Sequence, residues 1–249
     1  MSSVLVLDVG NSRTKWGVHS GRGWISFGVA PNAEIGTLAL REWQNLPRPA
    51  RIVGVNVAGE PARMRLEAQL ARWRVPPHWL VATAAAGGVV NSYAQPGQLG
   101  ADRWAALVAA RKRALGAEPS PPPVVVVNAG TAVTIDALGA DGVFRGGVIV
   151  PGLRLMLQAL AEHTAGLKAP AGTYRDFPTN TGDALFSGAV QAITGAIGEM
   201  RTRLAAGTSE VKCLLAGGAA NDIAPHLSGA VEVVENLVLE GVLALADAG

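Results

Sequence analysis

Short apolar runs alternate with longer amphipathic stretches along the chain. The aliphatic residues 4–7 and 124–127 each precede a polar residue and a glycine-containing turn, a pattern that predicts a β-hairpin at both places. Other apolar runs predict buried strands at residues 51–57, 146–150 and 211–215. Amphipathic or Ala-rich stretches predict helices at residues 60–73, 101–115, 153–161, 182–204 and 235–246. In the first of these helices, Met64, Leu66 and Leu70 are expected to face the core. Because strands alternate with helices, we expect an α/β fold.

The two predicted hairpins open segments that resemble one another. Residues 4–18 and 124–138 match at an offset of 120 residues: four aliphatic residues, then Asp8 or Asn128, then a glycine two positions later. Between them, the Pro-rich sequence EPSPPP can neither continue a helix nor form a central strand. We therefore predict an internal duplication with a ligand cleft between the halves. The expected parts are an N-terminal domain at 1–117, a linker at 118–123 and a C-terminal domain at 124–249.

Composition narrows the class of protein. Hydrophobic residues make up 49% of the 249 positions and charged residues 16%, so the chain can bury a core. The formal net charge is only +2, which makes no basic footprint for nucleic acid. No run reaches the ~18 apolar residues of a membrane span, and no secretory signal is visible. The single cysteine, Cys213, precludes an intrachain disulfide. We expect a cytoplasmic protein that binds neither nucleic acid nor membrane.

The first predicted turn carries groups that suit a polyphosphate and a metal ion. Asp8 ends the strand, and a carboxylate there could hold Mg²⁺ directly or through water. Gly10 lets backbone N–H groups approach a phosphate, and the side chains of Asn11, Ser12, Thr14 and Lys15 add donors. The ordinary alternative is a hairpin turn stabilised by its own Asp and Asn. The similar segment at Asn128–Thr131 favours phosphate binding, because two such hairpins could hold one polyphosphate.

A second group of candidates lies at the head of the helix predicted for 101–115. Asp102 follows Leu99–Gly100–Ala101, and a plain helix cap explains such an Asp. Arg103 beside it offers a bidentate grip on a carboxylate, and Tyr93 lies in the loop just upstream. An acid, an anion-binding group and a phenol near one loop–helix junction suggest a small-molecule site.

Other segments carry weaker signals. Thr179–Asp183 fits an ordinary helix N-terminus, although such an end can also face an anion or a hydroxyl-bearing ligand. Gly217–Gly218 is explained equally by a bare turn or by a close approach to a nucleotide base. The four histidines show no metal-ligand spacing, and the chain contains no Walker A loop, zinc pattern or Gly-x-Ser-x-Gly elbow.

These short motifs, taken in order, resemble those of the type III pantothenate kinases, the group that includes Bvg accessory factors. The matches cover nearly the whole chain: DVGNS at Asp8–Ser12, the Tyr93 loop, LGADRW at Leu99–Trp104, AGTA at Ala129–Ala132, GGVIVPG at Gly146–Gly152, NTGDALFSG at Asn180–Gly188, AGG at Ala216–Gly218 and LVLEG at Leu237–Gly241. The resemblance implies an actin-like ATPase fold, with two duplicated ribonuclease-H-like domains and the active site in their cleft. It also implies a homodimer that phosphorylates the 4′-hydroxyl of pantothenate with ATP, the first step towards coenzyme A.

The resemblance also assigns roles to individual residues. Asp102 matches the proton acceptor, and Asp8 matches the acid that organises Mg²⁺ and the phosphates. The residues that match ATP contacts are Asp8, Val9, Gly10, Asn11, Ser12, Arg13, Thr14, Lys15 and Thr131. Those that match pantothenate contacts are Tyr93, Gly100, Ala101, Asp102, Arg103 and Thr181, with Arg103 assigned to the substrate carboxylate and Thr181 coming from the neighbouring subunit.

The sequence departs from the family's pattern at Asn128. Family members commonly carry Asp there, and it helps to bind a monovalent cation such as K⁺ or NH₄⁺. Asn keeps an oxygen ligand but loses the charge, so we expect weakened cation binding. Two alternatives to a kinase remain at this point. One is a catalytically weak regulatory protein on the same fold, and the other is a ribonuclease-H-like metal nuclease. The nuclease would need more carboxylates at strand ends and a basic groove.

Overall fold

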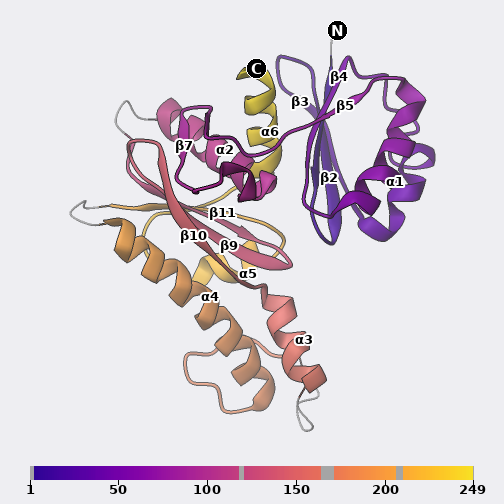
Figure 1. Cartoon of the computed structure of the whole chain (residues 1–249). Coiled ribbons are helices and arrows are strands. Elements are labelled where there is room, and N and C mark those ends of the chain that lie inside the picture. The colour runs from indigo at the N-terminus through magenta and orange to yellow at the C-terminus, as the bar shows by residue number, and fades with distance from the viewer. Residues whose placement is uncertain (1–2, 118–120, 164–170, 206–209, 249) are drawn as a thin grey trace. The chain divides into compact units, whose positions relative to one another are not determined.

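A computed structural model describes residues 3–117, 121–163, 171–205 and 210–248 (Figure 1). The chain forms two compact units. Unit 1 comprises Met1–Lys112 and Asn236–Gly249, and unit 2 comprises Arg113–Glu235. The C-terminal residues therefore pack with the N-terminal strands, whereas the expected domain 124–249 had placed them in the second half. Residues 118–120 of the expected linker lie outside the described residues, and the exact domain boundaries stay a prediction.

Unit 1 is built on a five-stranded mixed sheet with the order β3-β2-β1-β4-β5. Its strands are β1 (Val4–Val9), β2 (Arg13–His19), β3 (Trp24–Pro31), β4 (Arg51–Asn56) and β5 (Pro77–Trp79). β1, β2 and β3 pair antiparallel, and β4 and β5 continue from β1 in parallel. The first predicted hairpin is confirmed, and so is the strand expected at 51–57.

The remaining elements of unit 1 are η1 (Asn32–Leu40), α1 (Glu60–Leu70), η2 (Ala71–Trp73), β6 (Ala85–Ala86), β7 (Val89–Asn91), η3 (Pro96–Gln98), the first part of α2 (Ala101–Ala117) and α6 (Leu237–Ala248). They include two short strands, β6 and β7, that are not part of this five-stranded sheet. Figure 1 shows α1 on one side of the sheet and α6 on the other. Gly241 of α6 lies so close to α2 that an added Cβ would come within 1.8 Å of the Ala105 carbonyl oxygen.

The alternation of side chains along β1 decides what each face of the sheet does. Leu5, Leu7 and Val9 point into a fully buried cluster with Leu66 and Leu70 of α1. The intervening positions, which include Asp8, face the other side, where α6 packs. Asp8 is therefore on the side of the sheet to which α2 and α6 belong.

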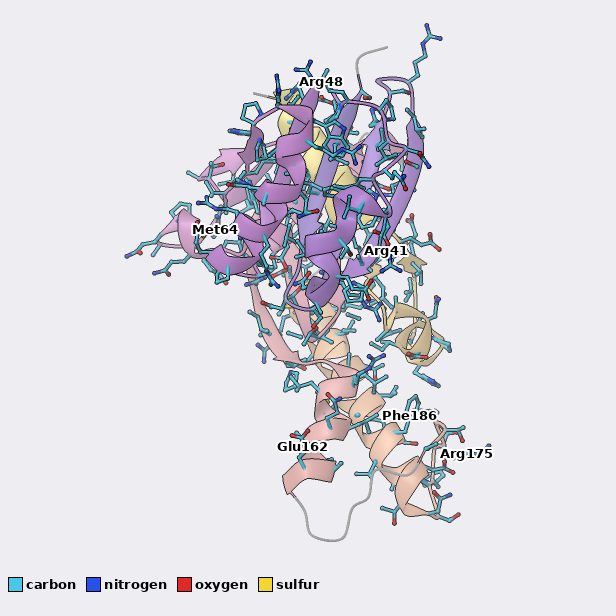
Figure 2. The ribbon with its side chains drawn as sticks, turned by 90° about the vertical axis from the view of Figure 1, so that its right-hand side faces the viewer. Arg41, Arg48, Met64, Glu162, Arg175 and Phe186 are labelled. Carbon is cyan, nitrogen blue, oxygen red and sulfur yellow. The ribbon has the colours of Figure 1, made fainter. Side chains whose placement is uncertain are left out.

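One expectation for α1 is wrong. Met64 was expected in the core beside Leu66 and Leu70, but it is 62% exposed and points outward (Figure 2). Ala62, Leu66 and Leu70 are spaced four residues apart and form the buried stripe. Met64 lies about 200° around the helix from Ala62, on the solvent side.

Unit 2 repeats the strand arrangement of unit 1. Its strands are β8 (Val124–Ala129), β9 (Ala132–Leu138), β10 (Val143–Pro151), β11 (Lys212–Ala216) and β12 (Val231–Val233). They run in the order β10-β9-β8-β11-β12, with β8, β9 and β10 antiparallel and β11 and β12 added in parallel to β8. Both units thus share one topology, as expected for a duplicated fold.

The helices of unit 2 are α3 (Leu153–His163), α4 (Thr181–Ala205), the short α5 (Ala220–Ile223) and η4 (Ala224–His226). Val190, Ile193 and Ile197 on α4 pack with Val125 and Val127 of β8 in a fully buried core. Figure 2 shows α3, which carries Glu162, beside α4, which carries Phe186. In the part of the chain that the structure describes, no helix is long and apolar enough to cross a membrane.

Candidate active site

The first hairpin makes a tight turn between β1 and β2. The Gly10 N–H donates to the Arg13 carbonyl (3.1 Å), and Asn11, Ser12 and Arg13 are exposed at the tip. The side chains of Val9 and Thr14 are fully buried on the α1 side of the sheet. Val9 and Thr14 were expected to contact ATP, but their buried side chains can only support the turn, which leaves their backbone groups for a ligand. The side chains that a ligand could reach are those of the exposed tip.

Asp8 and Lys15 are direct cross-strand partners in the β1–β2 pair. Residues opposite one another on one face of an antiparallel pair interact. The pKa of Asp8 is raised to about 7, chiefly by burial and also by repulsion from Asp102, while the charge of Lys15 lowers it. Two acids far apart in the sequence, Asp8 and Asp102, are thereby brought close enough to repel each other.

Asp102 lies in the first turn of α2, which begins when the Trp104 N–H donates to the Gly100 carbonyl (2.9 Å). Its carboxylate accepts the Arg103 backbone N–H (2.8 Å). Burial raises the pKa of Asp102, while that hydrogen bond and the charge of Arg103 lower it. Gly100 makes room for the group, because an added Cβ would lie 2.7 Å from the Asp102 Oδ1.

Arg103 and Tyr93 meet beside this acid. The Arg103 Nη1 donates to the Tyr93 hydroxyl (3.2 Å), and the guanidinium carbon lies 5.9 Å from the centre of the tyrosine ring. Arg103 is buried although it is charged. A buried guanidinium of this kind can bind an anionic group such as a carboxylate.

Two asparagines that the sequence analysis did not single out hold the loops of this site. Asn32 begins η1, and its side chain bonds to residues 10, 11 and 14 of the first hairpin. Asn91 ends β7, and its side chain bonds to the loop that carries Tyr93. An Asn two residues before a loop residue is an Asx-turn signal that could have indicated Asn91. Asn32 has no such signal, because its partners lie about twenty residues upstream.

Backbone contacts support the second hairpin, in unit 2. The Gly152 N–H donates to the Thr131 carbonyl (2.9 Å), and an added Cβ there would come within 2.2 Å of the Gly130 carbonyl oxygen. Gly217, at φ +101°, approaches Ala129 equally closely. The AGTA, GGVIVPG and AGG motifs thus converge on one turn, which explains their glycines.

Thr181 is the first residue of α4 and lines a cavity of about 1080 Å³ between α3 and α4. The N-terminus of α4 is capped by its neighbours. The Asp183 N–H donates to the Asn180 Oδ1 (2.9 Å), and the Asp183 Oδ1 accepts the Thr173 N–H (2.8 Å). The cavity walls are mainly apolar, with Leu155, Leu160 and Leu185 among them.

The structure therefore gathers most of the expected site residues within unit 1. Asp8, the turn 10–15, the Tyr93 loop and residues 100–103 belong to that unit, whereas Asn128, Thr131 and Thr181 belong to unit 2. Among the described residues, no group of three or more His, Cys, Asp or Glu could hold a metal ion.

Comparison with known proteins decides the family. The family model described as type III pantothenate kinase matches residues 4–203 of this chain. The chain belongs to the type III pantothenate kinase family. The type III pantothenate kinase of Leptothrix cholodnii is 44% identical over 252 residues, covering 98% of this chain and 96% of its relative.

Solved structures agree on the fold of this kinase. A Baf family transcriptional activator from Campylobacter jejuni has a TM-score of 0.65 at 20% identity, covering 98% of this chain and 97% of its own. The ethanolamine utilization protein EutJ from Carboxydothermus hydrogenoformans has a TM-score of 0.56 at 13% identity, covering 100% and 90%. The kinase has an actin-like ATPase fold, which confirms the expected fold class.

Proposed function

We propose that in this pantothenate kinase Asp102 is the general base that accepts the proton of the 4′-hydroxyl. The observation that carries this assignment is that the Asp102 carboxylate is close enough to Asp8 for their charges to repel and bonds to Arg103, which in turn bonds to Tyr93. The reaction joins the hydroxyl oxygen to the γ-phosphorus of ATP as the bond to the β–γ bridging oxygen breaks. The proton passes to Asp102, ADP leaves and 4′-phosphopantothenate remains, the first intermediate of coenzyme A synthesis.

Asp8 is the residue that would hold Mg²⁺ together with the phosphate oxygens of ATP. The donor set fits, because Mg²⁺ in kinases commonly binds one or two carboxylates and substrate phosphates instead of an all-protein cage. Burial disfavours a lone carboxylate here, so a cation beside Asp8 would stabilise its charged form. When bound, the ion would neutralise charge that develops on the transferring phosphoryl group. Lys15, the cross-strand partner of Asp8, adds positive charge on the same face.

The turn of the first hairpin supplies the remaining groups for ATP. Its exposed residues Asn11, Ser12 and Arg13 offer backbone N–H groups, as anion-binding turns do. We assign Thr131 on the second hairpin to the same ligand. A neutral pair, Asn128 opposite Thr134, replaces the charged pair of the first hairpin, and we therefore infer a weak site for K⁺ or NH₄⁺.

Pantothenate is a carboxylate with a hydroxyl at its other end, which suits the groups around Asp102. We assign the carboxylate of pantothenate to Arg103, with Tyr93, Gly100 and Ala101 lining the same end of α2. Support comes from the burial of Arg103 and its bond to Tyr93. With these assignments, pantothenate would lie beside Asp102.

We also propose that the kinase works as a homodimer in which Thr181 reaches the pantothenate site of the other subunit. The apolar cavity at Thr181 supports this proposal, because Leu155 and Leu160 are 42% and 40% exposed beside it. Mixing Arg103→Ala subunits with Thr181→Ala subunits should restore one intact site per heterodimer. Absence of any recovered activity after proven subunit exchange would refute the shared site.

One assay tests the proposed reaction as a whole. ADP release should require pantothenate, and phosphorus NMR should show one new phosphate monoester formed for each ADP. ADP release that is independent of pantothenate would contradict it. The same assay with RNA in place of pantothenate distinguishes a kinase from a nuclease. A nuclease would release nucleotides from the RNA without consuming ATP. We expect the kinase to act in the cytoplasm, where both of its substrates occur.

A further inference from the structure

The side chain of Asn32 collects the carbonyl groups of the first hairpin turn. Its Nδ2 donates to the Gly10 carbonyl (2.6 Å) and to the Asn11 carbonyl (3.0 Å), and its backbone N–H donates to the Ser12 carbonyl (3.0 Å). Its Oδ1 accepts the buried Thr14 hydroxyl (2.9 Å). Three consecutive carbonyls of the turn are thus held by one residue.

This arrangement fixes the direction of the amides of the turn. In a planar trans peptide the N–H points opposite to the carbonyl of the preceding residue. With the three carbonyls drawn towards Asn32, the N–H groups of residues 11, 12 and 13 point away from it. Successive N–H groups with a common direction form an anion-binding concavity. Asn32 therefore sets the turn for phosphate without lying at the tip itself.

Asn91 performs the same task for the loop that carries Tyr93. Its Nδ2 donates to the carbonyls of Thr83 and Pro96 (both 3.2 Å), which lie on either side of the loop. Its Oδ1 accepts the Tyr93 N–H (3.1 Å). The residue is only 7% exposed, so these bonds are shielded from water. Asn91 fixes the backbone of Tyr93, and Arg103 fixes its hydroxyl.

We propose that Asn32 and Asn91 are positioning residues that serve the two substrates separately, Asn32 for ATP and Asn91 for pantothenate. The proposal rests on the proposed function, which assigns the first hairpin to ATP and the Tyr93 loop to pantothenate. A merely structural role would lower stability or turnover without distinguishing the substrates.

The test is a crossed pair of substitutions. Asn32→Ala should raise the KM for ATP roughly 10-fold and leave the KM for pantothenate unchanged. Asn91→Ala should do the reverse. A roughly 10-fold change corresponds to the net contribution of about one hydrogen bond that orders the turn before ATP binds. Asn32→Asp should be worse than Ala for ATP, because it turns a carboxylate towards two carbonyls and adds negative charge beside the phosphates.

Gln69→Ala is the matched control. The Gln69 side chain accepts the Ala39 N–H (3.2 Å) and so ties the far end of η1, the helix that Asn32 begins. Its removal should lower the melting temperature slightly and leave both KM values unchanged. If Asn91→Ala does not fold, Asn91→Ser must show the same selective rise for pantothenate.

The outcomes separate the inference from the function beneath it. Equal changes in both KM values, or a fall in kcat alone, would overturn the positioning roles. Calorimetric binding of ATP to Asn32→Ala needs no pantothenate and should weaken by the same roughly 10-fold factor. Unchanged ATP binding would overturn the role of Asn32 even in an active kinase. If the unsubstituted protein shows no pantothenate-dependent ADP release, the proposed function itself is refuted.

Discussion

Asp8 on β1 faces Lys15 on β2 across an antiparallel pair, and the corresponding pair in unit 2 is Asn128 facing Thr134. The two hairpins share their topology but not their charge. The acid and the base are both replaced by neutral residues in the second hairpin. Each pair is therefore neutral as a whole, the first because its two charges cancel and the second because it has none. Both carboxylates of the candidate site, Asp8 and Asp102, come from unit 1.

Asp102→Asn should remove the proton acceptor while it keeps the shape of the side chain. We expect kcat to fall roughly 10²–10⁴-fold, the usual contribution of a positioned base, with ATP binding and the melting temperature retained. Asp141→Asn is the control, because that carboxylate pairs with Arg145 at the surface. Near-normal turnover of a folded Asp102→Asn protein would contradict the assignment. Loss of the melting transition would instead show that Asp102 serves the fold as a helix cap.

Arg103→Ala should weaken pantothenate binding and spare ATP. The expected loss is on the order of 2–5 kcal/mol, as for a buried charge pair that loses one partner. Tyr93→Phe removes only the hydroxyl that accepts the hydrogen bond from Arg103. It should weaken the free energy of pantothenate binding by about 0.5–1.5 kcal/mol. Calorimetric titration with each substrate measures both effects.

Arg113→Ala controls for the loss of positive charge, because Arg113 forms an exposed pair with Glu232 (3.2 Å). Equal losses of affinity for ATP and for pantothenate in Arg103→Ala would show that Arg103 supports the fold and not the substrate carboxylate.

Asp183 should make stability depend on pH in the acid range. The Thr173 N–H and then the Asn180 side chain lower the pKa of Asp183 below its ordinary value of 3.8. A lowered pKa stabilises the folded state above the unfolded pKa, and this contribution disappears as the pH falls through the folded pKa. Asp183→Asn should therefore lower the melting temperature at neutral pH and match the unsubstituted protein in strong acid. A constant difference across that range would refute the effect of charge.

The hydrophobic pattern predicted the regular elements of both units well. The hairpins, the strand at 51–57 and the long helices all appear within a few residues of their expected bounds. The short strands β5, β6, β7 and β12 were not predicted, because two or three residues carry too little periodicity. The eight-residue strand β3 was missed as well. The place of α6 depends on the contact of Gly241 with Ala105 of α2, a long-range packing that local pattern does not encode.

The candidate site was predicted in its residues but not in its geometry. Asp8 and Asp102 were both singled out, yet their mutual repulsion depends on where the tertiary fold places α2 relative to β1. The offset of 120 matched Thr14 with Thr134, but the second turn is one residue shorter, so Thr134 takes the place of Lys15. Asn32 could not be found, because its role arises only when β3 returns to the first turn.

Gly152→Ala should disturb the second hairpin. The new Cβ would lie 2.2 Å from the Gly130 carbonyl and 2.5 Å from the Thr131 carbonyl, both of them backbone atoms that cannot swing aside. We expect a loss of about 1–3 kcal/mol in the free energy of unfolding and weaker ATP binding. Gly195→Ala in α4 meets nothing within 4 Å and should stabilise by about 0.5–1 kcal/mol. Denaturant unfolding of both variants checks the contrast, and equal behaviour would contradict the close approach.

Asn128 should leave the kinase with a weak or absent response to K⁺. At an effective dielectric near 20, a unit charge pair about 3 Å apart is worth roughly 5 kcal/mol before desolvation, and an amide lacks this attraction. Even about 1.4 kcal/mol of surviving affinity is tenfold in binding. Asn128→Asp should therefore strengthen the response to K⁺, although the added negative charge can slow transfer of the γ-phosphoryl group.

The measurement is the initial rate against KCl for the unsubstituted protein and for Asn128→Asp, at an ionic strength held constant with a large inert cation. Thr134→Val is a useful companion, because it removes the hydroxyl opposite Asn128 and tests whether that neutral pair supplies oxygen ligands. Strong saturable activation of the unsubstituted protein by K⁺ would show that an amide and nearby carbonyls suffice. The argument from the lost charge would then be wrong, and Asn128 would count as a working ligand.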